Sequence, residues 1–195
     1  MFALWKRYRH VAAAAPLMLA MIATASAQAP YPNRNITLVL PFAAGSGTDT
    51  TTRVIGKELG TALGVSTVIE NKAGANGSIA ASFVARAPAD GYTLFVTTNT
   101  THSAAPGLFK HVPYDPIKDF TPVARIGSFP SLIAANPGQP FKSMQELVAF
   151  AKANPGKLSI AHGNSTGHIT IEALRARTKV DIARVPYRSN PAAIT

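Results

Sequence analysis

The stretch YPNRNITLVLPFAAGSGTDTTTRVIGKE, residues 31–58, decides the fold class of this chain. It places a short apolar run, Ile36–Leu40, before a loop of small residues, Phe42–Gly47, and a helical pattern then opens at Thr48 and Asp49. Because the first N–H groups of a helix have no intrahelical acceptor and lie at the positive end of its dipole, this strand–loop–helix turn predicts an anion-binding site.

The same alternation of strand and helix continues along the chain. It predicts an α/β fold with a parallel sheet and helices on the faces of that sheet. In such sheets ligands lie beyond the carboxyl ends of the strands, where the loops Phe42–Thr48 and Thr98–His102 follow. The expected strands are 36–40, 67–70 and 93–97; the expected helices are 50–63, with Val54, Ile55, Leu59 and Leu63 on one face, and 78–86, with Ile79 and Phe83 directed inward.

A second α/β unit is expected after the proline-rich crossover Val112–Pro116. Ser143 and Glu146 form a capping box that opens a helix. The other expected elements are strands at 123–126, 132–134, 158–161 and 182–185, a loop at Gly163–Gly167 and a helix at 169–178. The chain stops where a further helix should begin, so we expect a truncated protein with domains 1–27 (signal peptide), 28–113 (first α/β lobe) and 114–195 (second lobe, partial).

The N-terminus has the pattern of a secretory signal peptide. The cations Lys6, Arg7 and Arg9 precede an apolar, alanine-rich stretch, and Ala25–Ala27 reads as a cleavage site that leaves Gln28 first. The chain contains no cysteine, which excludes disulfides and thiolate metal sites. We therefore expect an exported, soluble protein of a bacterial periplasm.

Charge and histidine placement limit the function classes. The chain has 19 Lys and Arg against 9 Asp and Glu, an excess that favours anionic ligands. No basic stripe interleaved with aromatic residues is present, so a nucleic-acid partner is not expected. His111, His162 and His168 lack metal-ligand spacing and are interpreted as surface or loop residues. We expect no metal and no cofactor.

Two motifs suggest other functions. Gly163–Gly167 matches G-x-S-x-G, so a secreted serine esterase that uses Ser165 is an alternative. After Ser165 only His168 could serve as the base, and it is three residues away on the same loop or helical turn. The segment Gly45–Thr48 lacks the lysine of a phosphate-binding P-loop. What remains is two small-residue loops, each opening a helix in a different half of the chain, which together predict a two-lobed clamp for a carboxylate.

The segment from Tyr31 to the end of the chain resembles the substrate-binding receptors of tripartite tricarboxylate transporters, the Bug or TctC-like family. The resemblance implies a Venus flytrap of the type II periplasmic-binding-protein class, whose lobes close over a small organic anion, usually a carboxylate, for delivery to the membrane components of a transporter. It implies a receptor and not an enzyme, with a ligand sensor for a signalling partner as an alternative. The motifs that carry it are Tyr31-Pro32 with Ile36–Phe42, Gly45–Asp49 with Arg53, Glu70–Lys72 with Gly74–Gly77, Ala89–Leu94, Tyr114–Pro116 with Asp119-Phe120, and Val185–Arg188.

The resemblance also assigns ligand contacts. Asp49, being acidic, is expected to act as a helix N-cap, to orient the loop amides, or to accept from an amine or hydroxyl of the ligand. We expect a monomer, and we expect that these 195 residues alone neither fold stably nor bind well. The identity of the ligand stays open. The expected ligand-binding residues are Phe42, Ala43, Gly45, Ser46, Gly47, Thr48 and Asp49; Thr98, Asn99 and Thr100; Gly163, Asn164, Ser165, Thr166, Gly167 and His168; and Arg188, followed by Ser189.

Overall fold

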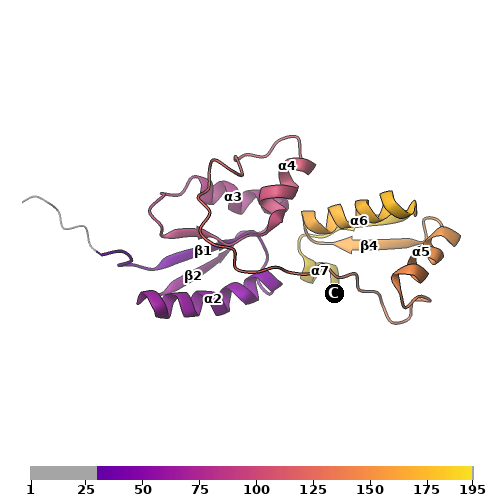
Figure 1. The fold of residues 1–195 in the computed structure, drawn as a ribbon, viewed down its shortest axis with the longest axis horizontal. Helices are drawn as coiled ribbons and strands as arrows, with labels where there is room; N and C mark the ends of the chain where they lie inside the picture. The colour runs from indigo at the N-terminus through magenta and orange to yellow at the C-terminus, as the bar shows by residue number, and fades with distance from the viewer. Residues whose placement is uncertain (1–29, 195) are drawn as a thin grey trace, which may run out of the picture. The chain divides into compact units, whose positions relative to one another are not determined.

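The computed structural model describes residues 30–194 (Figure 1). The predicted signal peptide, residues 1–27, lies outside the described residues. Within residues 30–194, no helix has the length and apolar character needed to cross a membrane.

The first sheet contains three parallel strands in the order β2-β1-β3. Strand β1 (Ile36–Leu40) lies between β2 (Thr67–Asn71) and β3 (Thr93–Phe95), and Leu38 is paired with residues of both neighbours. Four of the five residues of β1 are buried, because the central strand of a parallel sheet is covered on both faces. The predicted parallel pairing is confirmed.

Helix α2 (Gly47–Leu63) packs on this sheet through a face of small residues. Gly56 and Gly60 are both buried, and a Cβ added at Gly56 would lie 3.0 Å from Leu38 Cδ1. The absence of side chains at these two positions therefore lets the helix backbone approach the strands closely. Helix α3 (Ser78–Ala85), which follows a short 3₁₀ turn η1 (Ala75–Gly77), also buries small residues, Ala80 and Ala81.

The predicted inward faces of these two helices are partly wrong. Val54 is 63% exposed and Ile79 52% exposed, and both were expected to face the core. Across the two helices the residues that pack against the sheet include glycine, alanine, threonine and serine. These small residues fit the narrow space beside the sheet, and the larger side chains of the two helices lie toward solvent. Leu63 and Phe83 are also exposed.

After β3 the chain turns into a π-helix, η2 (Thr100–Ala104), and the short helix α4 (Ala105–Leu108). The predicted loop Thr98–His102 is thus helical from Thr100 onward. From 109 to 143 the chain forms neither helix nor strand, and Figure 1 shows it leading from α4 to the helix α5 (Met144–Ala153). The strands predicted at 123–126 and 132–134 are wrong: Val123 and Leu132 are more than 80% exposed, and no described strand lies beside them to complete a ladder.

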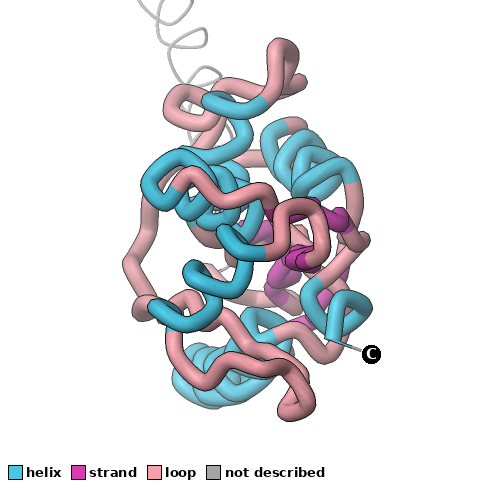
Figure 2. Tube along the Cα trace, turned by 90° about the vertical axis from the view of Figure 1, so that its right-hand side faces the viewer, coloured by secondary structure: helices cyan, strands magenta, loops and turns pink. Residues whose placement is uncertain are grey.

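The second sheet pairs β4 (Leu158–His162) with β5 (Ile182–Pro186) in parallel. Helices α5 (Met144–Ala153) and α6 (Ser165–Thr178) accompany it, and α7 (Asn190–Ile194) follows β5. In Figure 2 the helices lie outside the strands. The core of this part consists of Phe141, Leu147, Ala151, Val180 and Ile182, with Phe150, Leu158, Ile160 and Leu174 packed against it.

The start of α5 confirms the predicted capping residue. Ser143 is the N-cap, and its Oγ accepts from the Glu146 N–H at 3.2 Å, while the Glu146 carboxylate accepts from the Lys142 N–H at 2.7 Å. Helix α6 begins at Ser165, four residues before the predicted start, so the predicted loop Gly163–Gly167 extends into its first turn. The boundary predicted between residues 113 and 114 stays a prediction.

Candidate functional site

The loop after β1 presents backbone N–H groups at the start of α2. Ser46 is the N-cap: its Oγ accepts from the Asp49 N–H at 3.2 Å, and its carbonyl accepts from the Thr50 N–H at 2.9 Å. Gly47 and Thr48 are the first two residues of the helix, so their N–H groups have no intrahelical acceptor. Two adjacent N–H donors at the positive end of a 17-residue helix are chemically suited to an anionic oxygen.

Asp49 stabilises this loop through the hydrogen bonds of its carboxylate. Its carboxylate is buried and accepts from the Gly45 N–H at 2.9 Å, Arg53 Nε at 3.0 Å and Asn71 Nδ2 at 3.0 Å. Arg53 is the largest cause that lowers the Asp49 pKa to about 2, so the group is ionised at neutral pH. The prediction that Asp49 is an N-cap is wrong, because Ser46 fills that position; the hydrogen bond from Gly45 fits the alternative that Asp49 orients the loop amides.

A second helix start is built in the same way after β4. Asn164 is the N-cap of α6: its Oδ1 accepts from the Gly167 N–H at 2.8 Å, and its carbonyl accepts from the His168 N–H at 3.2 Å. The N–H groups of Ser165 and Thr166, the first two helical residues, therefore have no intrahelical acceptor. Both halves of the chain thus present a pair of N–H donors at a helix start.

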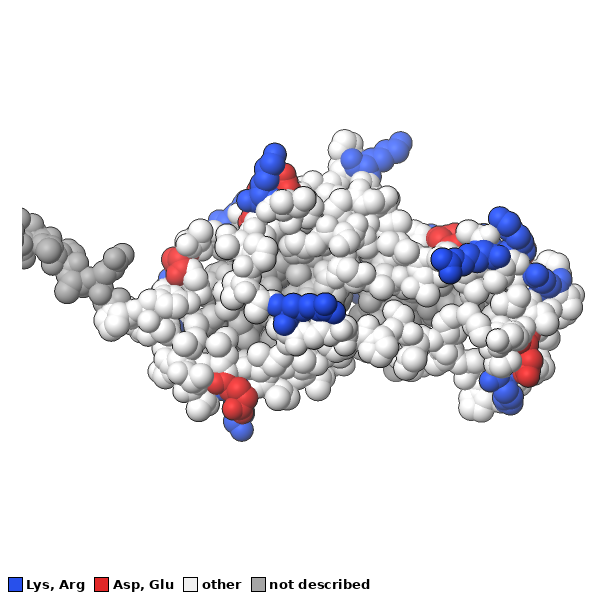
Figure 3. Space-filling model, viewed as in Figure 1, with Lys and Arg blue, Asp and Glu red and all other residues white. Residues whose placement is uncertain are grey.

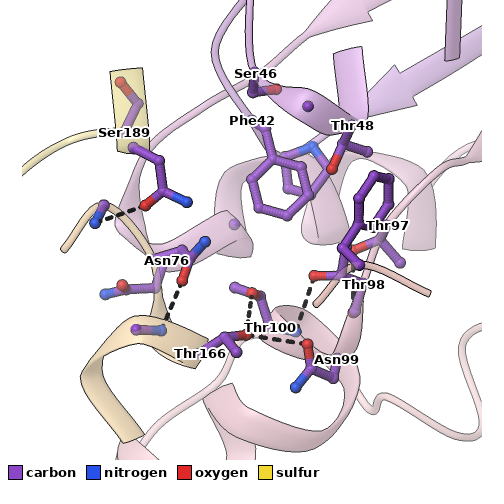
Figure 4. A pocket seen from close by; sticks show the side chains of 18 of the residues that line it. Phe42, Ser46, Thr48, Asn76, Thr97, Thr98, Asn99, Thr100, Thr166 and Ser189 are labelled. Atoms are coloured by element: carbon purple, nitrogen blue, oxygen red, sulfur yellow. Dashed lines mark hydrogen bonds between the residues drawn. The ribbon is translucent and has the colours of Figure 1, made fainter. Parts of the chain in front are cut away.

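Side-chain hydrogen bonds connect the second helix start to the segment after β3. Thr166 Oγ1 donates to Asn99 Oδ1 at 3.0 Å, and it lies 3.2 Å from Thr100 Oγ1 (Figure 4). Because the single hydroxyl proton of Thr166 is directed at Asn99, Thr100 is the donor in the second hydrogen bond. Thr98 Oγ1 accepts from the Thr100 N–H at 3.3 Å, which ties the third predicted loop to the same place.

Most of the predicted ligand-binding residues line one cavity. Its volume, about 2700 Å³, exceeds the ~300–1,000 Å³ of ordinary small-molecule sites, so only its polar part suits a small ligand. Asn76, Thr97 and Asn190 also line it and are not among the predicted ligand-binding residues; Asn76 stands in the Gly74–Gly77 turn, which the sequence marks only as one of the motifs of the family resemblance. The predicted residues that line the cavity are Phe42, Ala43, Ser46, Gly47, Thr48, Thr98, Asn99, Thr100, Gly163, Asn164, Thr166, Gly167 and Arg188.

Four predicted residues lie outside the lining: Gly45, Asp49, Ser165 and His168. Gly45 and Asp49 hydrogen-bond each other behind the first loop. Ser165 is 1% exposed, and within residues 30–194 its hydroxyl has no hydrogen-bond partner. That geometry gives no support to the esterase alternative, since a serine nucleophile needs a base within hydrogen-bond reach. Ligand contact by any of the predicted residues stays a prediction.

The interpretation of His162 as a surface or loop residue is wrong. It is the last residue of β4 and is 8% exposed, because the first turn of α6 covers it. Charged side chains, by contrast, are scattered over the face of the molecule shown in Figure 3 and do not gather there. Within residues 30–194 no group of three or more His, Asp or Glu residues could hold a metal ion.

Comparison with known proteins gives matches of sequence and of fold. The model of the family described as "Tripartite tricarboxylate transporter family receptor" (TctC) matches residues 51–195. Protein BugT of Bordetella pertussis is 35% identical over 151 residues, which are 75% of this chain and 46% of BugT. A UPF0065 protein of Pseudomonas sp., from the tcbD–tcbE intergenic region, is 33% identical over 150 residues, 75% of this chain and 44% of that protein.

Solved structures agree with these matches. A Rhodopseudomonas palustris protein with adipate superposes with a TM-score of 0.82 at 37% identity, and MatC from the same organism with bound malate superposes at 0.77 and 38% identity. The matched region covers 85% and 84% of this chain, respectively, and 56% of each of those proteins. The periplasmic binding protein BugD has a TM-score of 0.69 at 30% identity, with 84% of this chain and 55% of BugD covered. The chain spans about half the length of these relatives.

Proposed function

Since the chain belongs to the tripartite tricarboxylate transporter receptor family, we propose that it is a periplasmic receptor for a small organic carboxylate. It captures the anion and presents it to the membrane components of a tripartite transporter. The binding step involves no covalent chemistry, in keeping with a family of receptors. One observation carries the proposal: two helix starts contribute residues whose N–H groups lack an intrahelical acceptor to one cavity, Gly47 and Thr48 from α2 and Thr166 from α6, and Thr166 hydrogen-bonds Asn99 there.

The chemistry of the lining favours a carboxylate without an amine. The nearest buried acid, Asp49, already accepts from Gly45, Arg53 and Asn71, so it has little capacity left for an ammonium group of a ligand. The donors around the cavity include backbone N–H groups, hydroxyls such as that of Thr98, side-chain amides such as that of Asn76, and the cation Arg188. Solved structures of relatives with adipate and with bound malate support the same class of ligand.

The test removes one N–H donor and leaves the helix intact. Gly47 is the first helical residue, a position where proline is tolerated, and Ser46 before it has the extended backbone that precedes proline readily (φ −68°, ψ 158°). A Cβ at Gly47 meets only Phe129 Cε1, at 4.0 Å, so there is room for the side chain. Gly47→Pro therefore deletes a single hydrogen bond to the anion.

Isothermal titration with malate and with adipate measures the effect. A hydrogen bond to a charged group contributes about 1.5–3 kcal/mol, so Gly47→Pro should weaken binding by about tenfold or more. Gly47→Ala keeps the N–H and is the matched control, with affinity near that of the wild type. Equal affinities for the two variants, or ester hydrolysis that disappears in Ser165→Ala, would contradict the proposal.

The proposed location has its own test. If the protein is exported with cleavage after Ala27, its periplasmic form begins at Gln28. Intact-mass measurement of the protein released from the periplasm by osmotic shock should give the mass of the chain from Gln28 onward. Recovery of the uncleaved chain from the cytoplasm alone would contradict export.

A further inference from the structure

His162 forms two directed hydrogen bonds beneath the second helix start. Its Nδ1 lies 3.0 Å from the Asn164 carbonyl oxygen, and its Nε2 lies 3.0 Å from Arg184 Nη1. A carbonyl oxygen only accepts, so Nδ1 carries the proton; a guanidinium only donates, so Nε2 is the acceptor. The two neighbours together select the neutral Nδ1–H tautomer.

The position of Arg184 follows from the strand register. Arg184 on β5 is paired with Ile160, and His162 is paired with Pro186, so the two side chains are diagonal neighbours on one face of the sheet. Arg184 Nε also lies 3.4 Å from Glu172 Oε1, on the second turn of α6. Glu172 thereby holds the guanidinium against the imidazole.

His162 is packed directly against the helix start that it contacts. A Cβ added at Gly167 would lie 2.8 Å from His162 Cβ, and the His162 and His168 rings stack with centroids 5.6 Å apart. Because Asn164 is the N-cap, a displacement of its carbonyl would move the first turn of α6 as well. The positions of the N–H groups of Ser165 and Thr166 therefore depend on the His162–Asn164 hydrogen bond.

We propose that Arg184 is a positioning residue for ligand binding: by selecting the Nδ1–H tautomer of His162 it fixes Asn164 and the first turn of α6, and so aims the N–H group of Thr166 at the carboxylate. This inference rests on the proposed function. Without Arg184 the Nε2–H tautomer becomes accessible, and its Nδ1 lone pair faces the Asn164 carbonyl oxygen. Two acceptors repel each other, so the helix start shifts.

Glu172 provides a matched control because it binds two arginines. Arg175 Nη1 lies 3.2 Å from Glu172 Oε1, on the same carboxylate as Arg184, but no hydrogen bond joins Arg175 to His162. Arg184→Leu removes the donor to His162, Arg184→Gln supplies a neutral N–H donor in its place, and Arg175→Leu removes only the other arginine. Titration with malate and adipate then separates tautomer selection from a general loss of charge.

We expect Arg184→Leu to weaken binding at least tenfold, Arg184→Gln to restore most of the affinity, and Arg175→Leu to remain within about twofold of the wild type. The ¹⁵N spectrum of the imidazole should show the Nδ1–H tautomer of His162 in the wild type and in Arg175→Leu, and a mixture in Arg184→Leu. In ligand-free protein the amide resonances of Ser165 and Thr166 should shift only in Arg184→Leu.

Two results would overturn the inference: equal affinities of Arg184→Leu and Arg175→Leu, or an unchanged His162 tautomer in Arg184→Leu. Failure of the wild type to bind either acid would count against the proposed function, while the tautomer and amide measurements would still decide the role of Arg184. If Arg184→Leu does not fold, the tautomer is measured in the wild type, and a His162 tautomer other than Nδ1–H would overturn the inference. The affinity of Arg184→Gln is then compared with that of the wild type.

Discussion

Asp49 is an ionised, buried carboxylate next to a loop that we propose binds carboxylates. Arg53 pairs with its charge, and Gly45 and Asn71 occupy its remaining acceptor positions. Asn71 Nδ2 also donates to the Phe42 carbonyl at 3.1 Å, so one network holds both ends of the loop. The negative charge therefore holds the loop in place from outside the cavity lining, while the residues at the helix start line the cavity.

This network predicts a large effect of removing the charge. Asp49→Asn would place an amide N–H₂ against the donors of Arg53 and Asn71, and a buried donor without an acceptor costs about 1–3 kcal/mol. We expect a fall of that size in the free energy of unfolding, measured by urea denaturation, together with weaker carboxylate binding. Asp115→Asn, in an exposed turn, is the control and should change stability less. Equal stability of the two variants would show that Asp49 does not organise the loop.

Gly163 allows a close approach between two backbone segments. A Cβ at this position would overlap the main chain at Ser189 and Asn190, and Gly163 N–H donates to Asn190 Oδ1 at 2.9 Å. Since main-chain atoms cannot give way as a side chain tip can, Gly163→Ala should destabilise the protein by about 1–3 kcal/mol. Thermal melting measures this, with Gly107→Ala, where nothing lies within 4 Å of the added Cβ, as the matched control. A melting temperature equal to that of the control would contradict the prediction.

The helix starts of the site could be predicted from the sequence because particular residue types favour helix caps. Small polar residues at a strand–helix junction predict helix caps, and Ser143 was identified as a cap correctly. The buried position of His162 was not predictable in this way. Its partner Arg184 is 22 residues distant, and only the register of β4 against β5 brings the two together.

At the level of elements, the alternation of strands and helices was predictable outside residues 109–143, and the packing faces were not. Strands of apolar residues with helical periodicity between them specify a parallel α/β arrangement. The faces of α2 and α3 depart from the apolar stripe because the sheet lies too close for Val54 or Ile79 to fit beneath them. Hydrophobic periodicity records which side chains are apolar, and it does not record the distance between a helix and its sheet.

The N-cap of α5 gives a prediction at this scale. Ser143 Oγ satisfies the Glu146 N–H, and α5 contributes Leu147 and Ala151 to the core of the second sheet. Ser143→Ala should lower the free energy of unfolding by about 1 kcal/mol, as the loss of such a cap does in general. Ser131→Ala, at an exposed position without helix or strand, is the control in urea denaturation. A destabilisation no larger than that of the control would mean that α5 does not depend on this cap.

At the scale of the whole molecule, two predicted strands failed because a strand depends on a partner that is distant in the sequence. The apolar stretches 123–126 and 132–134 have strand-like composition, but a strand requires a neighbour that completes its hydrogen bonds. Residues 30–194 provide none for them, and the side chains of Val123, Ile126 and Leu132 are exposed. Composition predicts what a segment can form, and pairing decides what it does form.

Two histidines make the stability of the whole molecule depend on pH. Burial lowers the pKa of His102, and burial, followed by the charges of Arg184 and His168, lowers the pKa of His162. The rings of Phe95 and Phe120 face His102, and Arg184 and the stacked His168 face His162. In both places the neutral imidazole is the form that fits its neighbours.

Because both pKa values are lower in the folded protein, the unfolded chain binds more protons as the pH falls below about 6.5. The histidine contribution to stability is therefore complete above this pH and is lost as the pH falls through the folded pKa values. The lowered pKa values of Asp49 and Asp115 act only near and below about pH 4, so they do not affect stability between pH 5.5 and 7.5.

Urea denaturation at pH 7.5, 6.5 and 5.5 should show decreasing free energies of unfolding. The decrease should be smaller in His102→Gln and in His162→Gln and unchanged in His111→Gln, an exposed position. A wild type whose stability is constant from pH 7.5 to 5.5 would contradict the assignment of neutral, buried imidazoles.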